Sequence, residues 1–268
     1  MKLLSAFSAF SAFSAFPALA ALALASAAPD GLADALPAGN CADPQAATDL
    51  SQCDFSRQKL VGRNLRGARL AGARMESTDF RQADLRDADL RGSNAKWANF
   101  SAANLAAADF READLFHATF DDANLSNGNL QRANLFGANL INAKAQGADF
   151  SGAYLKDILM EGIDLSGGSI RNCNALRGVF SDARLVGTDL SGADLTGAAM
   201  DSADLTNSTL KGTRLAGATL RHALFRGANL DSADFSNADL WDANFQQATN
   251  LDDSVRAALA EPFVVRGR

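Results

Sequence analysis

Residues 83–110 read ADLRDADLRGSNAKWANFSAANLAAADF, and every fifth residue of this stretch is apolar, beginning with Leu85. The same five-residue periodicity of apolar residues starts at Phe55 and continues to Phe245 without a change of register. No charged residue occupies any of these periodic positions. Residues five apart would spread around an α-helix, which turns about 100° per residue. In a flat strand they would alternate between the two faces. The chain must therefore turn in one sense every five residues, as in a solenoid whose apolar residues point to a common axis.

We call the apolar residue that recurs every five positions the central residue. The residues around each central residue support this interpretation. The residue two positions before the central residue is usually small, as at Ala83 and Ala88. A small side chain fits a narrow interior. The residue directly before the centre is most often Asp or Asn, which accept hydrogen bonds in tight turns. Two residues after the centre Gly is frequent, and it tolerates turn dihedrals that other residues resist.

The segments ADLRD at 83–87, ANLFG at 133–137, ADLTG at 193–197 and ANLDS at 228–232 resemble the A(D/N)LxX unit of pentapeptide repeat proteins. The resemblance covers about residues 53–249. It implies an all-β fold, a right-handed quadrilateral parallel β-helix with four units per coil, and hence about ten coils. Residues twenty apart should then stack in columns, so Phe80, Phe100 and Phe120 should form an aromatic ladder inside the coil.

The two ends of the chain differ from the repeats. Residues 1–27 have the pattern of a signal peptide, because Lys2 precedes an uncharged stretch that ends in Ala25-Ser26-Ala27. An uncleaved membrane anchor is the alternative. Residues 28–52 should form an N-terminal linker or cap and residues 250–268 a C-terminal cap or tail, with a short helix over 252–261 that begins at Asp252 or Asp253.

The cysteines fit an exported, periplasmic or secreted, protein. Cys41 and Cys53 lie just before the repeats, and in an oxidising compartment a disulfide between them would pin the first turn of the coil. Two free thiols are the alternative. Cys173 occupies a small interior position and should be buried.

Outward aromatic residues give the first candidate surface. Phe116 and Phe136 each follow a central residue and lie twenty apart, so they should stack in one exposed column, with Trp97 beside it and Leu176 further along. Such a column is typical of a docking surface for a partner. Alternatively, it is a groove that other parts of the chain cover.

Two further features depart from the average repeat. The N-terminal end of the array is basic and includes Arg57, Arg63, Arg66, Arg86 and Arg91. These side chains either attract an acidic partner or lipid headgroups, or pair with neighbouring Asp residues. Bulky Ile158 and Ile163 stand where Ala is usual, which predicts a bulge or a local widening of the coil within residues 154–163.

No arrangement of residues indicates an enzyme. His117 and His222 lie five coils apart, and no phosphate-binding loop, nucleophile motif or metal-ligand spacing is present. The sequence therefore predicts no catalytic residue, cofactor or metal. It favours an exported scaffold that binds a protein of the cell envelope. The alternative is a DNA mimic that protects gyrase, a role known in this family, if the signal is not used.

The charge of the chain bears on its partners. The net charge of −6 disfavours binding to nucleic acid. Contact with a membrane would involve only the N-terminal segment or the basic end. A homodimer through the C-terminal tail is a further expectation.

Overall fold

The computed structural model describes residues 36–253, 255 and 256. The expected signal peptide, residues 1–27, and residues 257–261 of the expected C-terminal helix lie outside the described residues. Contacts divide the chain into Met1–Ala35 and Leu36–Arg268, and all described residues belong to the second unit.

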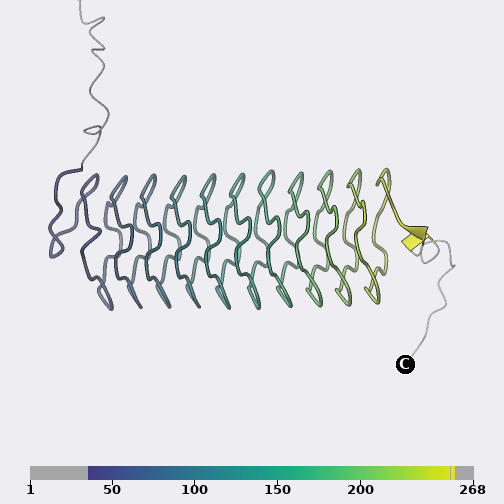
Figure 1. Ribbon diagram of the computed structural model, residues 1–268, viewed down its shortest axis with the longest axis horizontal. Coiled ribbons are helices and arrows are strands. Elements are labelled where there is room, and N and C mark those ends of the chain that lie inside the picture. The colour runs from purple at the N-terminus through teal and green to yellow at the C-terminus, as the bar shows by residue number, and fades with distance from the viewer. Residues whose placement is uncertain (1–35, 254, 257–268) are drawn as a thin grey trace, which may run out of the picture. The chain divides into compact units, whose positions relative to one another are not determined.

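Parallel bridges between residues twenty apart define the coil. Each residue that precedes a central residue pairs with its counterpart in the next coil, as in Asp84 with Asn104 and Asn104 with Asn124. The series runs without interruption from the bridge between Asp54 and Arg74 to that between Asn229 and Thr249. Every strand segment is a single bridged residue, and the coils follow one another along one axis (Figure 1). The right-handed four-sided parallel β-helix with four units per coil is confirmed.

Each five-residue unit satisfies its backbone in the same way. The amide of Leu85 donates to the carbonyl of Asn104 at 2.7 Å, and the amide of Asn104 donates back to the carbonyl of Ala83 at 2.9 Å. Within the unit, the amide of Ala88 donates to the carbonyl of Leu85 at 3.1 Å and closes the turn. The Asp84 carboxylate accepts from the Arg86 amide at 3.3 Å, which explains why Asp and Asn recur at this position.

The turns explain the frequent glycines. Two residues after every central residue, from Arg57 to Gln247, φ is positive and lies between 52° and 72°. This left-handed conformation costs a residue with a Cβ about 1–2 kcal/mol. Half of the non-glycine residues at these positions are Asp, Asn or His, which tolerate it better than most.

Central and small residues together fill the interior. The rings of Phe100 and Phe120 stack with centroids 4.9 Å apart, and Phe110 meets the ring of Phe100 edge-on at 5.8 Å. Near the other end Phe225 and Phe245 stack at 4.6 Å. The predicted interior columns are therefore present.

The four sides of the coil are named here by their central residues. Face 1 starts at Phe55, face 2 at Leu60, face 3 at Leu65 and face 4 at Leu70, and each continues with every twentieth residue. On each face the residue before the centre and the two after it point outward, because the centre and the small residue point inward.

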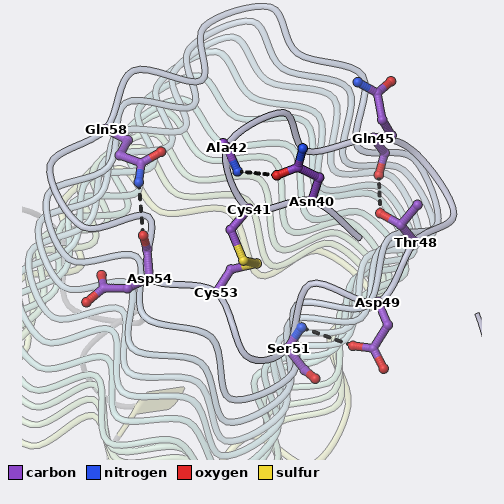
Figure 2. The surroundings of a disulfide bond; sticks show 10 residues. All are labelled: Asn40, Cys41, Ala42, Gln45, Thr48, Asp49, Ser51, Cys53, Asp54 and Gln58. Atoms are coloured by element: carbon purple, nitrogen blue, oxygen red, sulfur yellow. Dashed lines mark hydrogen bonds between the residues drawn. A yellow bond between two sulfur atoms is a disulfide. The ribbon is translucent and has the colours of Figure 1, made fainter. Parts of the chain in front are cut away.

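The N-terminal cap begins with a shortened coil. Ala38 bridges to Asp49, which itself bridges to Arg69. Leu50 is fully buried, so the coil geometry begins one unit earlier than the predicted start at residue 53. Figure 2 shows the disulfide that closes this end: Cys41 and Cys53 are bonded, with Cα atoms 5.4 Å apart. The structure thus contains the disulfide that the sequence predicts.

The C-terminal end has the start of the expected helix. A helical turn includes Asp253, Val255 and Arg256. The Asp252 side chain accepts from the Val255 amide at 3.2 Å, and this identifies Asp252 as the N-cap. Val255 is buried and belongs to the hydrophobic core, so this turn packs against the last coil.

The predicted bulge within residues 154–163 is wrong. Leu159 bridges to Asn139 and Val179 with the regular spacing of twenty. Ile158 is fully buried, and Gly178 stands beside it in the next coil. A Cβ at Gly178 would lie 2.7 Å from Cε2 of Phe180 and 3.2 Å from Cγ2 of Ile158, so its absence leaves room for both side chains while the backbone keeps its path.

Candidate functional site

An aromatic cluster lies on face 1, where the outward positions of successive coils meet. The rings of Phe116 and Phe136 stack with centroids 5.4 Å apart and planes 6° apart. Trp97 meets Phe116 edge-on at 5.4 Å. The coil register brings these three residues together, as the sequence predicts.

His117 and Tyr154, which the sequence pattern did not predict as members, also belong to this cluster. Tyr154 stacks on Phe136 with centroids 6.0 Å apart, and the His117 ring lies 4.3 Å from that of Phe116. Gly137 makes space for the imidazole, because a Cβ there would meet the ring. The sequence signal that could have placed Tyr154 in the cluster is its spacing of eighteen residues from Phe136. The residue before a central residue lies diagonally beside the residue that follows the central residue of the preceding coil.

The exposed parts of the cluster are amphipathic. Trp97 is 50% exposed and Tyr154 is 40% exposed, whereas Phe116 and Phe136 are partly buried by their mutual stacking. Tryptophan and tyrosine combine a large apolar ring with a hydrogen-bond donor. These residue types are enriched in protein–protein interfaces, and they contribute much of the binding energy there.

Charged pairs border the aromatic cluster. Lys96 contacts Asp114 at 3.0 Å on one side, and Arg177 contacts Asp157 at 2.8 Å on the other. Leu176 follows in the same outward column, but Lys156 lies between it and Phe136. The cluster is therefore an apolar patch with a polar rim, and Leu176 is its neighbour and not a member.

The basic end is largely neutralised by carboxylates. Four of its guanidinium groups lie in ion pairs: Arg63 with Asp43, Arg66 with Asp87, Arg86 with Asp84, and Arg91 with Asp89. The hydrogen bond from Arg86 lowers the pKa of the Asp84 carboxyl, and the same contact raises the pKa of Arg86. Arg57 lies at an exposed corner of face 1. The structure supports the ion-pairing alternative for the four paired residues.

A surface hollow of about 350 Å³ lies on face 4. Its arginines already have carboxylate partners, since Arg111 contacts Asp109 at 2.6 Å and Arg132 contacts Glu112 at 3.2 Å. Because carboxylates compensate these positive charges, the hollow is a poor candidate for an anion-binding site. It is lined by Arg91, Gly92, Arg111, Glu112, Gln131 and Arg132.

The described residues offer little reactive chemistry. Within residues 36–253, 255 and 256, no three His, Cys, Asp or Glu side chains are placed to hold a metal ion. The Cys173 thiol is buried and donates to the carbonyl of Phe150 at 2.8 Å. Burial raises the pKa of this thiol to about 12, so the thiolate nucleophile is scarce at neutral pH.

In the part of the chain that the structure describes, no helix has the length and hydropathy to cross a bilayer.

Comparison with known proteins agrees with this geometry. The family model for the pentapeptide repeat region matches residues 64–140, and the model for pentapeptide repeats (8 copies) matches residues 133–172, 179–212 and 213–249. A comparison with curated protein sequences found no match.

Several solved structures are similar to this chain. The pentapeptide repeat protein HetL from Nostoc sp. strain PCC 7120, involved in heterocyst differentiation regulation, is 30% identical over 74% of this chain and 91% of its own, with a TM-score of 0.44. The plasmid-mediated fluoroquinolone resistance protein QnrB1 is 19% identical over 73% of this chain and 94% of its own, with a TM-score of 0.41. A pentapeptide repeat protein from the thylakoid lumen of Arabidopsis thaliana is 25% identical over 51% of this chain and 73% of its own, with a TM-score of 0.23. From its five-residue units and the family models that match them, the chain belongs to the pentapeptide repeat family.

Proposed function

We propose that this protein is an exported, non-enzymatic scaffold that binds a partner protein of the cell envelope through the aromatic cluster on face 1. The observation that carries the proposal is the pair of exposed rings, Trp97 and Tyr154, at the two ends of a stacked aromatic row. A protein that needed only a soluble surface would have polar residues at these outward positions, as most other coils do.

Export is supported by two separate features. Residues 1–27 have the pattern of a signal peptide. The disulfide between Cys41 and Cys53 is of a kind that persists outside the cytosol, in oxidising compartments. Cell fractionation followed by N-terminal sequencing of the mature chain tests this part. A mature N-terminus near Ala28 in the periplasmic or secreted fraction is the expected result, and a full-length cytosolic product would contradict it.

Binding is tested by affinity capture from envelope extract. The double variant Phe116→Ser/Phe136→Ser removes the centre of the cluster but leaves the interior intact, since both side chains point outward. Val186→Ser is the matched control, because Val186 is a partly buried apolar residue at the equivalent position on face 3. The expected result is a partner that wild type and the control retain and the double variant loses. The same set of retained proteins for all three would rule out the cluster.

The alternative function is a DNA mimic that protects gyrase. The acidic net charge of −6 favours it, whereas a used signal peptide and the disulfide argue against a cytosolic target. A supercoiling assay with purified gyrase and a quinolone separates the two functions. Protection of supercoiling by this protein would support the mimic, and unchanged inhibition would exclude it.

A further inference from the structure

Face 2 differs from the other three faces in its charge. Its basic residues, Lys59, Arg81 and Arg221, all lie toward its ends, and no Lys or Arg occupies an outward position of this face from Asn99 to Ser202. Faces 1, 3 and 4 carry Lys or Arg in the same coils. The outward carboxylates in this part of face 2 are Asp121, Asp122, Glu161, Asp182 and Asp201.

These five carboxylates take no part in the ion pairs found among the described residues. Asp121 accepts from the Ile141 amide at 3.2 Å, and Asp201 accepts from the Arg221 amide at 3.0 Å. The Arg221 guanidinium pairs with Asp239 at 2.7 Å, and the charge of Asp201 adds to the rise in the pKa of Arg221, so within the described residues Asp201 is the one member of the five with a nearby cation. On the other faces, by contrast, carboxylates such as Asp89 and Asp157 contact an arginine. The negative charge of face 2 is therefore left largely uncompensated within the protein.

An apolar row runs beside these carboxylates. Leu159 bridges to Val179, and Val179 bridges to Ala199, so the three residues lie in consecutive coils. All three occupy the position before a central residue, where Asp or Asn normally accepts a hydrogen bond from the turn. Their side chains have no hydrogen-bond acceptor. The turns of this face in three consecutive coils therefore lack the side-chain hydrogen bond that Asp or Asn would accept. Leu159 is 38% exposed, and Ile141 adjoins it from the preceding coil.

We propose that this strip of face 2, the apolar row and its five carboxylates, binds a cationic amphipathic helix of a partner protein. The apolar stripe of the helix would cover Leu159, Val179 and Ile141, and Lys or Arg side chains along one flank would meet the carboxylates. Two observations point to this occupant: the charge complementarity, and the spacing of the row.

The spacing selects a helix over an extended segment. Neighbouring coils are about 4.8 Å apart. One turn of an α-helix rises about 5.4 Å, so its apolar residues at i, i+4 and i+7 stay nearly in step with the row over three coils. Same-side residues of an extended strand repeat every 6.6–6.8 Å, approximately, and would fall out of step after one coil. A helix laid in an apolar groove is an established mode of recognition between proteins.

A synthetic peptide provides the test. The probe is an 18-residue helix with Leu at i, i+4 and i+7 spacing and Lys on one flank. One control peptide has Glu for each Lys, and the second has Ser for each Leu. Anisotropy of the labelled peptides is measured against the full chain. Saturable micromolar binding of the probe, with both controls weaker, is the expected result. No binding of the probe at millimolar protein would overturn the proposal.

Matched variants locate the binding. The triple variant Glu161→Gln/Asp182→Asn/Asp201→Asn removes three charges from the strip and should weaken binding about tenfold, because each is a separate contact with a cationic flank. The control triple variant Glu76→Gln/Glu112→Gln/Asp231→Asn removes three charges from faces 1 and 4. It should bind as wild type does. Equal weakening by the two triple variants would mean that only net charge matters, and would overturn the proposal.

The apolar half of the strip has its own test. Leu159→Ser should abolish binding with only a small change in the melting temperature, because the side chain lies on the surface and is 38% exposed. Unchanged binding by this variant would contradict the proposal. Sedimentation velocity detects the competing occupant, a second copy: self-association of wild type that Leu159→Ser removes would assign the row to a dimer instead. None of these outcomes involves the aromatic cluster, so the proposed function stands or fails separately.

Discussion

Phe80 and Phe100 lie twenty residues apart in the chain, yet their rings stack with centroids 5.1 Å apart and planes within 2° of parallel. Both side chains are fully buried, although no regular helix or extended strand connects them. This contact arises because four turns return the chain to the same face, one coil further along. The interior is therefore a set of columns, and a change at one central residue affects the coils on both sides.

Loss of an interior ring should be costly. We expect Phe100→Ala to lower the free energy of unfolding by about 3–5 kcal/mol, because a cavity would open between the rings above and below it. Phe116→Ala is the matched control, since it removes the same ring from an outward position. Urea unfolding measures both. A similar loss for the two variants would contradict the distinction between inward and outward columns.

The turn conformation can be tested without steric interference. At Gly62, φ is +66° and a Cβ would meet nothing within 4 Å, so Gly62→Ala isolates the cost of the left-handed backbone, about 1–2 kcal/mol. Gly147→Ala should cost about the same, because the atom that its Cβ would meet, Oδ1 of Asn127 at 2.7 Å, ends an exposed side chain that can turn away. Thermal unfolding compares the two variants. Equal stability of Gly62→Ala and wild type would refute the positive φ at this turn.

The disulfide should stabilise the first coil. Cys41 and Cys53 are twelve residues apart, and closing a loop of this size contributes about 3 kcal/mol through the unfolded chain. We expect Cys41→Ser/Cys53→Ser to lower the melting temperature. A reductant should lower the melting temperature of wild type in the same way and leave the variant unchanged. A variant as stable as the oxidised wild type would show that the bond does not constrain this end.

Two aspartates should respond to pH in opposite directions. Burial, together with the nearby charge of Asp122, raises the pKa of the Asp121 carboxyl. Its ionised form therefore opposes folding at pH 7, and this penalty disappears once the carboxyl is protonated in both states. Asp121→Asn should raise the melting temperature at pH 7, and the gain should vanish as the pH falls below about 4.

Asp84 provides the opposite case. The hydrogen bond from Arg86 lowers the pKa of its carboxyl, so its contribution to stability is present above the unfolded pKa and is lost as the pH falls through the folded pKa. Asp84→Asn should lower the melting temperature at pH 7 and have little effect in strong acid. Melting curves from pH 2 to 7 measure both variants. Parallel curves for the two would contradict the assigned environments.

The architecture was predictable because one periodic signal recurs in every unit. Charged residues never interrupt the central positions, so the register of the coil, the Phe80–Phe100 stack and the column of Phe116 and Phe136 all followed from counting. The disulfide was predictable from its place just before the array. The unit centred on Leu50 was missed, because Thr48 replaces the small residue and the preceding unit lacks an apolar centre.

Side-chain detail between coils was harder to predict. The bulge expected from Ile158 is absent: the bridges keep their spacing of twenty, and Gly178, in the next coil, leaves space beside the Ile158 side chain. Tyr154 was missed as a member of the aromatic cluster because its contact with Phe136 is diagonal, eighteen residues apart. In both cases the decisive partner lies in another coil, so that a unit considered alone gives no sign of it.

Both proposed binding surfaces depend on four units per coil, and paired cysteines test that number most directly. Ser126 and Gln146 follow central residues in neighbouring coils of face 3, and their side chains are hydrogen-bonded at 3.0 Å. Ser126→Cys/Gln146→Cys should therefore form a disulfide on mild oxidation, seen by mass spectrometry, because Cα atoms one coil apart are about 4.8 Å from each other. Ser126→Cys/Ser151→Cys, twenty-five residues apart, should stay reduced. Bonding of the second pair and not the first would mean five units per coil, and would contradict the account.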